Sequence, residues 1–188
     1  VKLALPEIAD AVNLIADRLF QGGRLIYVGA GTSGRLGVMD ASECPPTFGV
    51  SPELIQGLIA GGVSALTDEI EGAEDDSIAG ESVMKNTGVN RKDVVLGLSA
   101  SGTTPFVLAA MEYTKQQGSA RIGLACEMDS VLLKNVDVAI CVPVGPEILY
   151  GSTRLKAGTA QKMILNMLST AVMVKLGKVY KNHMVDLR

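Results

Sequence analysis

The chain has 188 residues, of which 47% are hydrophobic and 20% charged, and its formal net charge is −3. This length predicts a single domain, and the composition is that of a globular protein. Because the chain is slightly acidic and has no basic run, nucleic acid is not an expected partner. No stretch reaches the about 18 consecutive apolar residues of a membrane span, so a membrane is not expected either.

The first half of the chain alternates helical and strand patterns. The opening residues, VKLALP, lack an initiator Met and a signal-peptide pattern, which is typical of a segment of a longer or processed protein. Apolar residues at helical spacing then predict a helix over 6–20, with Pro6 in its first turn. The elements expected next are a strand over 24–28, a glycine-rich turn and helix to residue 40, an irregular segment over 42–47 with two prolines, a strand over 54–60, and helices over 64–70 and 75–85.

The second half continues the same alternation. The residues between Pro105 and Gly118 predict a helix, because proline favours the first turn and glycine the position after the end. Strands are expected over 93–98, 121–126 and 136–142, a short helix over 131–135, and a loop over 143–150. A long helix over 156–176 has a predicted apolar face of Met163, Ile164, Met167, Leu168, Ala171 and Val172.

Short apolar strands alternating with helices predict a doubly wound α/β fold, with a five-stranded parallel sheet flanked by helices. Ligands of such sheets bind outside the carboxyl ends of the strands. The loops that follow the strands are therefore the expected place of a functional site.

The three cysteines, Cys44, Cys126 and Cys141, do not form a disulfide or metal-binding pattern. Cys126 and Cys141 lie in apolar runs, which predicts buried free thiols. Free thiols are typical of a reducing compartment, so the expected location is the cytoplasm. No metal site is expected.

The turn over 29–34, GAGTSG, satisfies the dinucleotide-binding pattern G-x-G-x-x-G. A dinucleotide site also needs an acidic residue about 20 residues further on, at the end of the second strand. That strand ends in Ala60-Gly61-Gly62 instead, so a dinucleotide is disfavoured.

A second turn, over 99–104, carries Ser99, Ser101, Thr103 and Thr104 around Gly102. Hydroxyl groups, backbone N–H groups and a helix N-terminus together form a cradle for an anion. The alternative is helix capping alone, which serine and threonine also favour. Four hydroxyls exceed what one cap needs, and two such turns at strand ends favour a phosphorylated polyol.

These residues resemble a known family. The turn over 99–104 matches the phosphate loop of sugar isomerase (SIS) domains, and 29–35 matches their first turn. Three further segments, over 40–49, 71–76 and 151–162, are similar to N-acetylmuramic acid 6-phosphate etherases. The resemblance implies one flavodoxin-like SIS domain over residues 1–188, without the family's C-terminal helical region. It also implies a homodimer, a sugar phosphate as substrate, and no metal or organic cofactor.

The resemblance also implies a reaction: D-lactate leaves sugar C3 by elimination, and water then adds to give N-acetylglucosamine 6-phosphate. Elimination needs a base and an acid within reach of the substrate. By resemblance, Glu43 is the acid and Glu74 the base, and burial beside 44–46 is expected to raise the pKa of Glu43. His183 is expected to be a surface or packing residue. Without the resemblance, Glu74 would be interpreted as a negative charge near a helix N-terminus, within a solvent-exposed acidic segment.

The binding residues also follow from the resemblance. The phosphate contacts carried over are Ser33, Ser99, Ser101 and Thr104, and the sugar contacts are Gly31, Thr32, Glu147 and Lys156. Tyr150 stands where relatives have a small residue. Two alternatives stay open: a sugar-phosphate isomerase with Glu147 as base, and a non-catalytic regulator related to the glucokinase regulatory protein.

Overall fold

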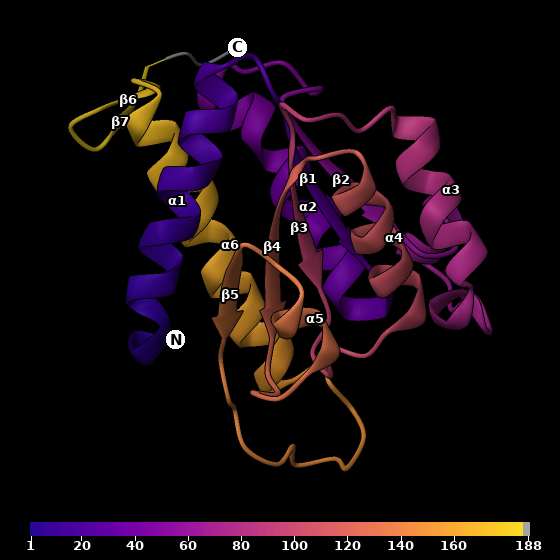
Figure 1. The fold of residues 1–188 in the computed structure, drawn as a ribbon. Helices are drawn as coiled ribbons and strands as arrows, with labels where there is room; N and C mark the ends of the chain where they lie inside the picture. The colour runs from indigo at the N-terminus through magenta and orange to yellow at the C-terminus, as the bar shows by residue number, and fades with distance from the viewer. Residues whose placement is uncertain (186–188) are drawn as a thin grey trace.

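The computed structural model describes residues 1–185 and contains a five-stranded sheet in which every pair of neighbouring strands is parallel (Figure 1). The order is β2-β1-β3-β4-β5. The strands are β1 (Leu25–Gly29), β2 (Ile55–Ile59), β3 (Val94–Leu98), β4 (Ala120–Ala125) and β5 (Val138–Cys141). This confirms the predicted doubly wound α/β fold. The chain changes direction between β1 and β3, which is where such sheets bind ligands.

Helices cover both faces of the sheet (Figure 1). One face packs against α1 (Leu5–Phe20), α2 (Gly31–Phe48) and α6 (Lys156–Lys175). The other packs against α3 (Ser77–Thr87), α4 (Pro105–Gln116) and α5 (Val131–Lys134). Every residue of β1 and β3 is buried, as a parallel sheet covered on both sides requires.

Short elements complete the described chain. Three 3-10 turns are η1 (Lys2–Ala4), η2 (Val63–Leu66) and η3 (Ala73–Asp75). A small antiparallel hairpin of β6 (Val179–Tyr180) and β7 (His183–Met184) follows α6. His183 is exposed in that hairpin, consistent with a surface residue.

The segment over 42–47 is helical, so the prediction of irregular structure there was wrong. Helix α2 contains Pro45 and Pro46 and ends only at Phe48, followed by Gly49 with a φ of 63° at the C-cap position. The two prolines remove two helix hydrogen bonds. Burial of Cys44 and Phe48 in the core offsets this cost, so tertiary packing overrides local preference.

Smaller differences also follow from packing. Met163 is 49% exposed and does not belong to the buried face of α6, while Ile164, Leu168 and Val172 do. Cys126 and Cys141 are free, as expected, but only half-buried. The helix expected over 64–70 is only the short turn η2. Among the helices within residues 1–185, none combines the length and the apolar character needed to cross a bilayer.

A buried carboxylate holds α2 against α6 and β1. Asp40 is 5% exposed and accepts hydrogen bonds from the Tyr27 hydroxyl (3.0 Å), Asn166 Nδ2 (2.9 Å) and Ser169 Oγ (3.1 Å). Burial raises the pKa of Asp40 above its ordinary value, although these hydrogen bonds oppose the shift. The three donors satisfy a group that would otherwise destabilise the core.

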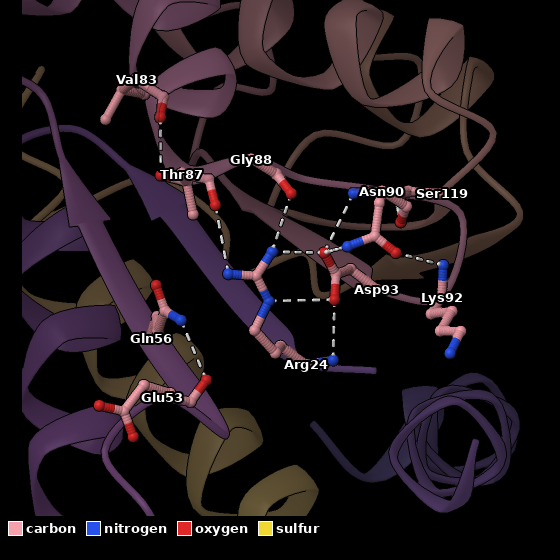
Figure 2. Close-up of polar contacts among 10 residues, drawn as sticks. All are labelled: Arg24, Glu53, Gln56, Val83, Thr87, Gly88, Asn90, Lys92, Asp93 and Ser119. Carbon is pink, nitrogen blue, oxygen red and sulfur yellow. Dashed lines mark hydrogen bonds and ion pairs between the residues drawn. The ribbon is translucent and has the colours of Figure 1, made fainter. Parts of the chain in front are cut away.

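An ion pair joins Arg24 and Asp93, the residues directly before β1 and β3, at the amino edge of the sheet (Figure 2). The buried Asp93 accepts hydrogen bonds from Arg24 Nη2 (2.7 Å), Arg24 Nε (3.1 Å) and Asn90 Nδ2 (3.0 Å). Arg24 also donates to the carbonyl groups of Thr87 and Gly88, at the end of α3. The hydrogen bond to Asp93 raises the pKa of Arg24. This cluster therefore fixes two strands and one helix at the edge opposite the strand carboxyl ends.

We predict that Asp93→Ala lowers the free energy of unfolding by about 3 kcal/mol, because it leaves the Arg24 guanidinium without its buried partner. Urea denaturation measures this difference. The matched control is Lys92→Ala, an exposed neighbour that should change stability by less than about 0.5 kcal/mol. Equal stabilities of the two variants would contradict the structural role of the ion pair.

Candidate active site

A cavity of about 670 Å³ opens at the carboxyl edge of the sheet, beside the ends of β1 and β2. Its walls come from the first turn of α2, the segment from η2 to η3, and the residues just before α6. Four carboxylates and two guanidinium groups line it: Asp68, Glu69, Glu71, Glu74, Arg35 and Arg154. The cavity is thus strongly polar and large enough for a phosphorylated sugar.

The turn between β1 and α2 brings backbone N–H groups to this cavity. A Cβ atom on Gly29 would lie 2.8 Å from the nitrogen of Gly34, so only glycine allows this close approach. Gly31, with a φ of 51°, and Thr32 line the cavity, at the positions expected to contact the sugar. The first turn of a helix carries unpaired N–H groups and a positive dipole end.

Glu74 lies on η3 and lines the cavity as an exposed side chain. The role of helix capping belongs to Asp76 instead, whose carboxylate accepts a hydrogen bond of 2.8 Å from the backbone N–H of Ala79 in α3. In the acidic segment over 71–76, Asp76 therefore caps α3 and Glu74 forms part of the cavity wall.

The loop between β3 and α4 lies next to this turn, because Leu98 pairs with Gly29 across the two strands. Ser99 Oγ lies 2.8 Å from Thr104 Oγ1 and 3.4 Å from Ser101 Oγ, and it accepts from the Gly102 N–H at 2.9 Å. Thr104 is the N-cap residue of α4, yet its side chain makes no capping hydrogen bond. These hydroxyl groups contact one another at the start of a helix, an arrangement suited to an anion.

Ser33 points toward α6. It is 7% exposed, and its hydroxyl group donates a hydrogen bond of 2.8 Å to Gln161 Oε1. The first turns of α2 and α6 are in close contact here, since a Cβ on Gly158 would lie 3.3 Å from the Thr32 methyl group. Ser33 thus links the glycine-rich turn to α6.

Glu147 caps α6. Its carboxylate accepts hydrogen bonds from the backbone N–H groups of Ala157 (2.9 Å) and Lys156 (3.1 Å), and the bond from Ala157 is the largest cause of its lowered pKa. Lys156 is exposed, and both residues lie outside the cavity described above. The long loop that carries Glu147 extends away from the sheet, with Tyr150 fully exposed on it (Figure 1).

Glu43 does not line the cavity that contains Glu74, and the burial expected for it is not found. It is exposed on α2, 12 positions beyond Gly31, and helix geometry places it about 18 Å further along the axis at about 1.5 Å per residue. The structure therefore gathers Gly31, Thr32 and Glu74 at the cavity and leaves Glu43 on another part of the surface.

Sequence reasoning missed the two arginines of the cavity. Arg35 Nε donates to the Leu66 carbonyl at 3.2 Å and Arg35 Nη2 to the Asp68 carbonyl at 3.0 Å, so Arg35 links α2 to η2 and to the segment after it. Arg35 and Arg154 lie in the segments over 29–35 and 151–162, which resemble the family, and this resemblance could have indicated them as site residues. Within residues 1–185, no group of His, Cys, Asp or Glu is arranged to hold a metal ion.

The fold and the site define a parallel α/β protein with two anion-type turns at the point where the strand order reverses. The chain belongs to the SIS domain family. Residues 7–115 match the glucokinase regulatory protein N-terminal SIS domain, and residues 74–171 match the SIS domain.

Curated relatives are similar over the whole chain. The N-acetylmuramic acid 6-phosphate etherase of Caldanaerobacter subterraneus is 56% identical over 188 residues, which cover 100% of this chain and 61% of that protein. The protein of the same name from Clostridium acetobutylicum is 54% identical, with 100% and 62% covered. The chain thus spans about three fifths of the length of these relatives.

Solved structures share the fold. The phosphoheptose isomerase of Neisseria gonorrhoeae superposes with a TM-score of 0.70 at 17% identity, covering 91% of this chain and 87% of that one. The enzyme of the same name from Francisella tularensis gives 0.66 at 19% identity, with 90% and 86% covered. At this identity the likeness concerns the fold alone.

We predict that Glu147→Gln lowers the thermal unfolding midpoint by a few degrees, because the neutral side chain interacts less strongly with the two α6 N–H groups. A depressed carboxyl pKa contributes stability only while the group is ionised. The difference from the unsubstituted chain should therefore be full at pH 7 and shrink as the pH falls below the ordinary value of 4.5. Scanning calorimetry at several pH values measures it, with the exposed Glu81→Gln as control; a difference independent of pH would contradict the capping role.

Proposed function

We propose that the chain carries the active domain of an N-acetylmuramic acid 6-phosphate etherase. The observation that supports this most directly is the position of Glu74 on the wall of a polar cavity that Gly31 and Thr32 also line, while the second turn suited to a phosphate group lies beside theirs. Relatives that carry this name are 54–57% identical to the chain. The substrate would be a small sugar phosphate, and the reaction calls for no metal or organic cofactor.

The reaction assigned to the site is an elimination followed by a hydration. Glu74 takes the proton from sugar C2 while the bond between C3 and the lactyl oxygen breaks, and an acid gives a proton to that oxygen. Water then adds across the resulting C2–C3 double bond, with its oxygen on C3 and a proton returned to C2. The products are N-acetylglucosamine 6-phosphate and D-lactate.

The binding groups follow the charges of that substrate. Ser33, Ser99, Ser101 and Thr104 are the proposed phosphate contacts. Ser99, Ser101 and Thr104 lie at the start of α4, and Ser33 lies in the first turn of α2. Arg35 and Arg154 are the cationic groups of the cavity and suit the lactyl carboxylate, since guanidinium groups pair well with carboxylates. Gly31 and Thr32 remain the proposed sugar contacts.

Glu43 fits the role of acid only if it comes from a second copy of the chain. Glu43 and Met39 are four residues apart and share one exposed side of α2, and Met163 is half-exposed on the neighbouring α6. Two symmetric copies that pack through this surface would bury exposed methionine side chains. We therefore propose a homodimer in which Glu43 acts at the partner's cavity.

The alternatives have less support. An isomerase that uses Glu147 as its base is disfavoured, because the α6 N–H groups lower the pKa of this carboxylate and weaken it as a base. A non-catalytic regulator is favoured by the match of residues 7–115 to a regulatory protein, but has no need of both Glu43 and Glu74. The three free cysteines favour a reducing compartment, and the cytoplasm is the proposed location.

We predict that Glu74→Gln reduces D-lactate release from N-acetylmuramic acid 6-phosphate by about 100-fold or more, which is the usual contribution of a positioned base. The affinity for N-acetylglucosamine 6-phosphate should remain within a few-fold, because the phosphate contacts are unchanged. An enzymatic lactate assay and titration calorimetry measure the two quantities.

The control for this variant is Asp75→Asn, the exposed neighbour on η3, which should retain lactate release. Undiminished turnover in Glu74→Gln would exclude this residue as the base. Sugar-phosphate binding by the unsubstituted chain without lactate release would instead support the regulator.

A site that combines Glu74 of one chain with Glu43 of its partner can be tested with mixed dimers. Glu43→Gln and Glu74→Gln should each be inactive alone, but mixed dimers contain one cavity with both glutamates intact. Equal amounts, unfolded and refolded together, should recover about a quarter of the original activity, since half of the dimers are mixed and each has one intact site of two. No recovery from mixed dimers confirmed by native mass spectrometry would exclude action of Glu43 in trans.

A further inference from the structure

Gln161 is a buried polar residue that the proposed reaction does not use. It lies in the second turn of α6 and is 1% exposed. Its Oε1 accepts a hydrogen bond from the Ser33 hydroxyl group, with 2.8 Å between the two oxygen atoms. Its Nε2 has no hydrogen-bond partner among residues 1–185. A buried N–H group without a partner is rare and costly, so it calls for an explanation.

The hydrogen-bond inventory of Ser33 suggests that explanation. A serine hydroxyl group has one proton to donate and can also accept. In the structure that proton goes to Gln161, so Ser33 cannot at the same time donate to a phosphate. A phosphate dianion only accepts hydrogen bonds, so the present arrangement does not suit the ligand that Ser33 is proposed to bind.

We propose that Gln161 is a positioning residue for Ser33, whose side-chain amide turns over when a phosphate group binds. After this rotation Nε2 donates to Ser33 Oγ, and the Ser33 proton is free to bond to a phosphate oxygen. The unpaired donor thereby gains a partner, and the group left unpaired is a carbonyl oxygen, which proteins tolerate better. This inference rests on the proposed role of Ser33 as a phosphate contact.

The position of Gln161 behind the glycine-rich turn supports a short-range effect of Gln161 on Ser33. Ser33 is the third residue of α2, directly after Thr32 of the cavity wall, and Gln161 follows Gly158, which packs against Thr32. Gln161 thus lies in a second layer behind the glycine-rich turn. It acts through Ser33 and does not itself reach the ligand.

The test is a double-mutant cycle of Gln161→Met and Ser33→Ala, read as dissociation constants by calorimetry. Gln161→Met keeps the side-chain length but cannot donate to Ser33 Oγ, and it should weaken binding of N-acetylglucosamine 6-phosphate about fivefold, the effect of losing one hydrogen bond between neutral groups. Binding of unphosphorylated N-acetylglucosamine should not change. In the Ser33→Ala background the same substitution should weaken binding less than about twofold.

Two further variants distinguish a specific loss of phosphate binding from a general loss of folding. Ser169→Ala removes a different buried hydrogen bond of α6, to Asp40, and should leave both affinities unchanged. Gln161→Asn retains an amide on a shorter side chain that does not reach Ser33, and should show the same phosphate-selective loss as Gln161→Met.

The role of Gln161 and the phosphate site itself can fail independently. Losses that are additive with Ser33→Ala, or equal for the two sugars, would overturn the role of Gln161 while the phosphate site stands. Failure of the unsubstituted chain to bind the sugar phosphate would overturn the site itself, and the role of Gln161 with it.

Discussion

The site depends on the close contact between the end of β1 and the first turn of α2. Gly29 and Gly34 approach so closely that a single Cβ atom would collide with backbone. Because nothing larger than hydrogen separates them, α2 starts immediately at the edge of the sheet. Gly31 and Thr32 in its first turn therefore line the cavity, and the loop that carries Ser99 lies next to this turn.

The polar groups of the molecule are divided between two edges of the sheet. At the amino edge, Arg24 and Asp93 are fully engaged with each other and with backbone, so this cluster serves stability. At the carboxyl edge, the side-chain contacts of the hydroxyl groups after β3 are with one another and with the backbone of their own loop, and Glu74 is exposed. This division is physically expected, because a group that acts on a ligand must not be satisfied by the protein alone.

Much of the fold followed from the sequence. Apolar runs and helical spacing placed the five strands and the main helices to within a few residues, since burial imposes these patterns directly. The segment with Pro45 and Pro46 did not follow, because the local cost of proline is outweighed by core contacts that only the folded chain makes. Met163 was misplaced for a related reason: an apolar residue on a helix need not face the core.

The sequence by itself determined the α/β class, the two anion-type turns, and, through resemblance, the candidate residues. Only the tertiary structure decided which of these residues meet. It brought Glu74 to the same cavity as Arg35, engaged Glu147 as a cap of α6, and placed Glu43 toward the far end of a continuous helix. The physical reason is that motifs report residue types and local turns, whereas side-chain partners depend on how separate helices pack.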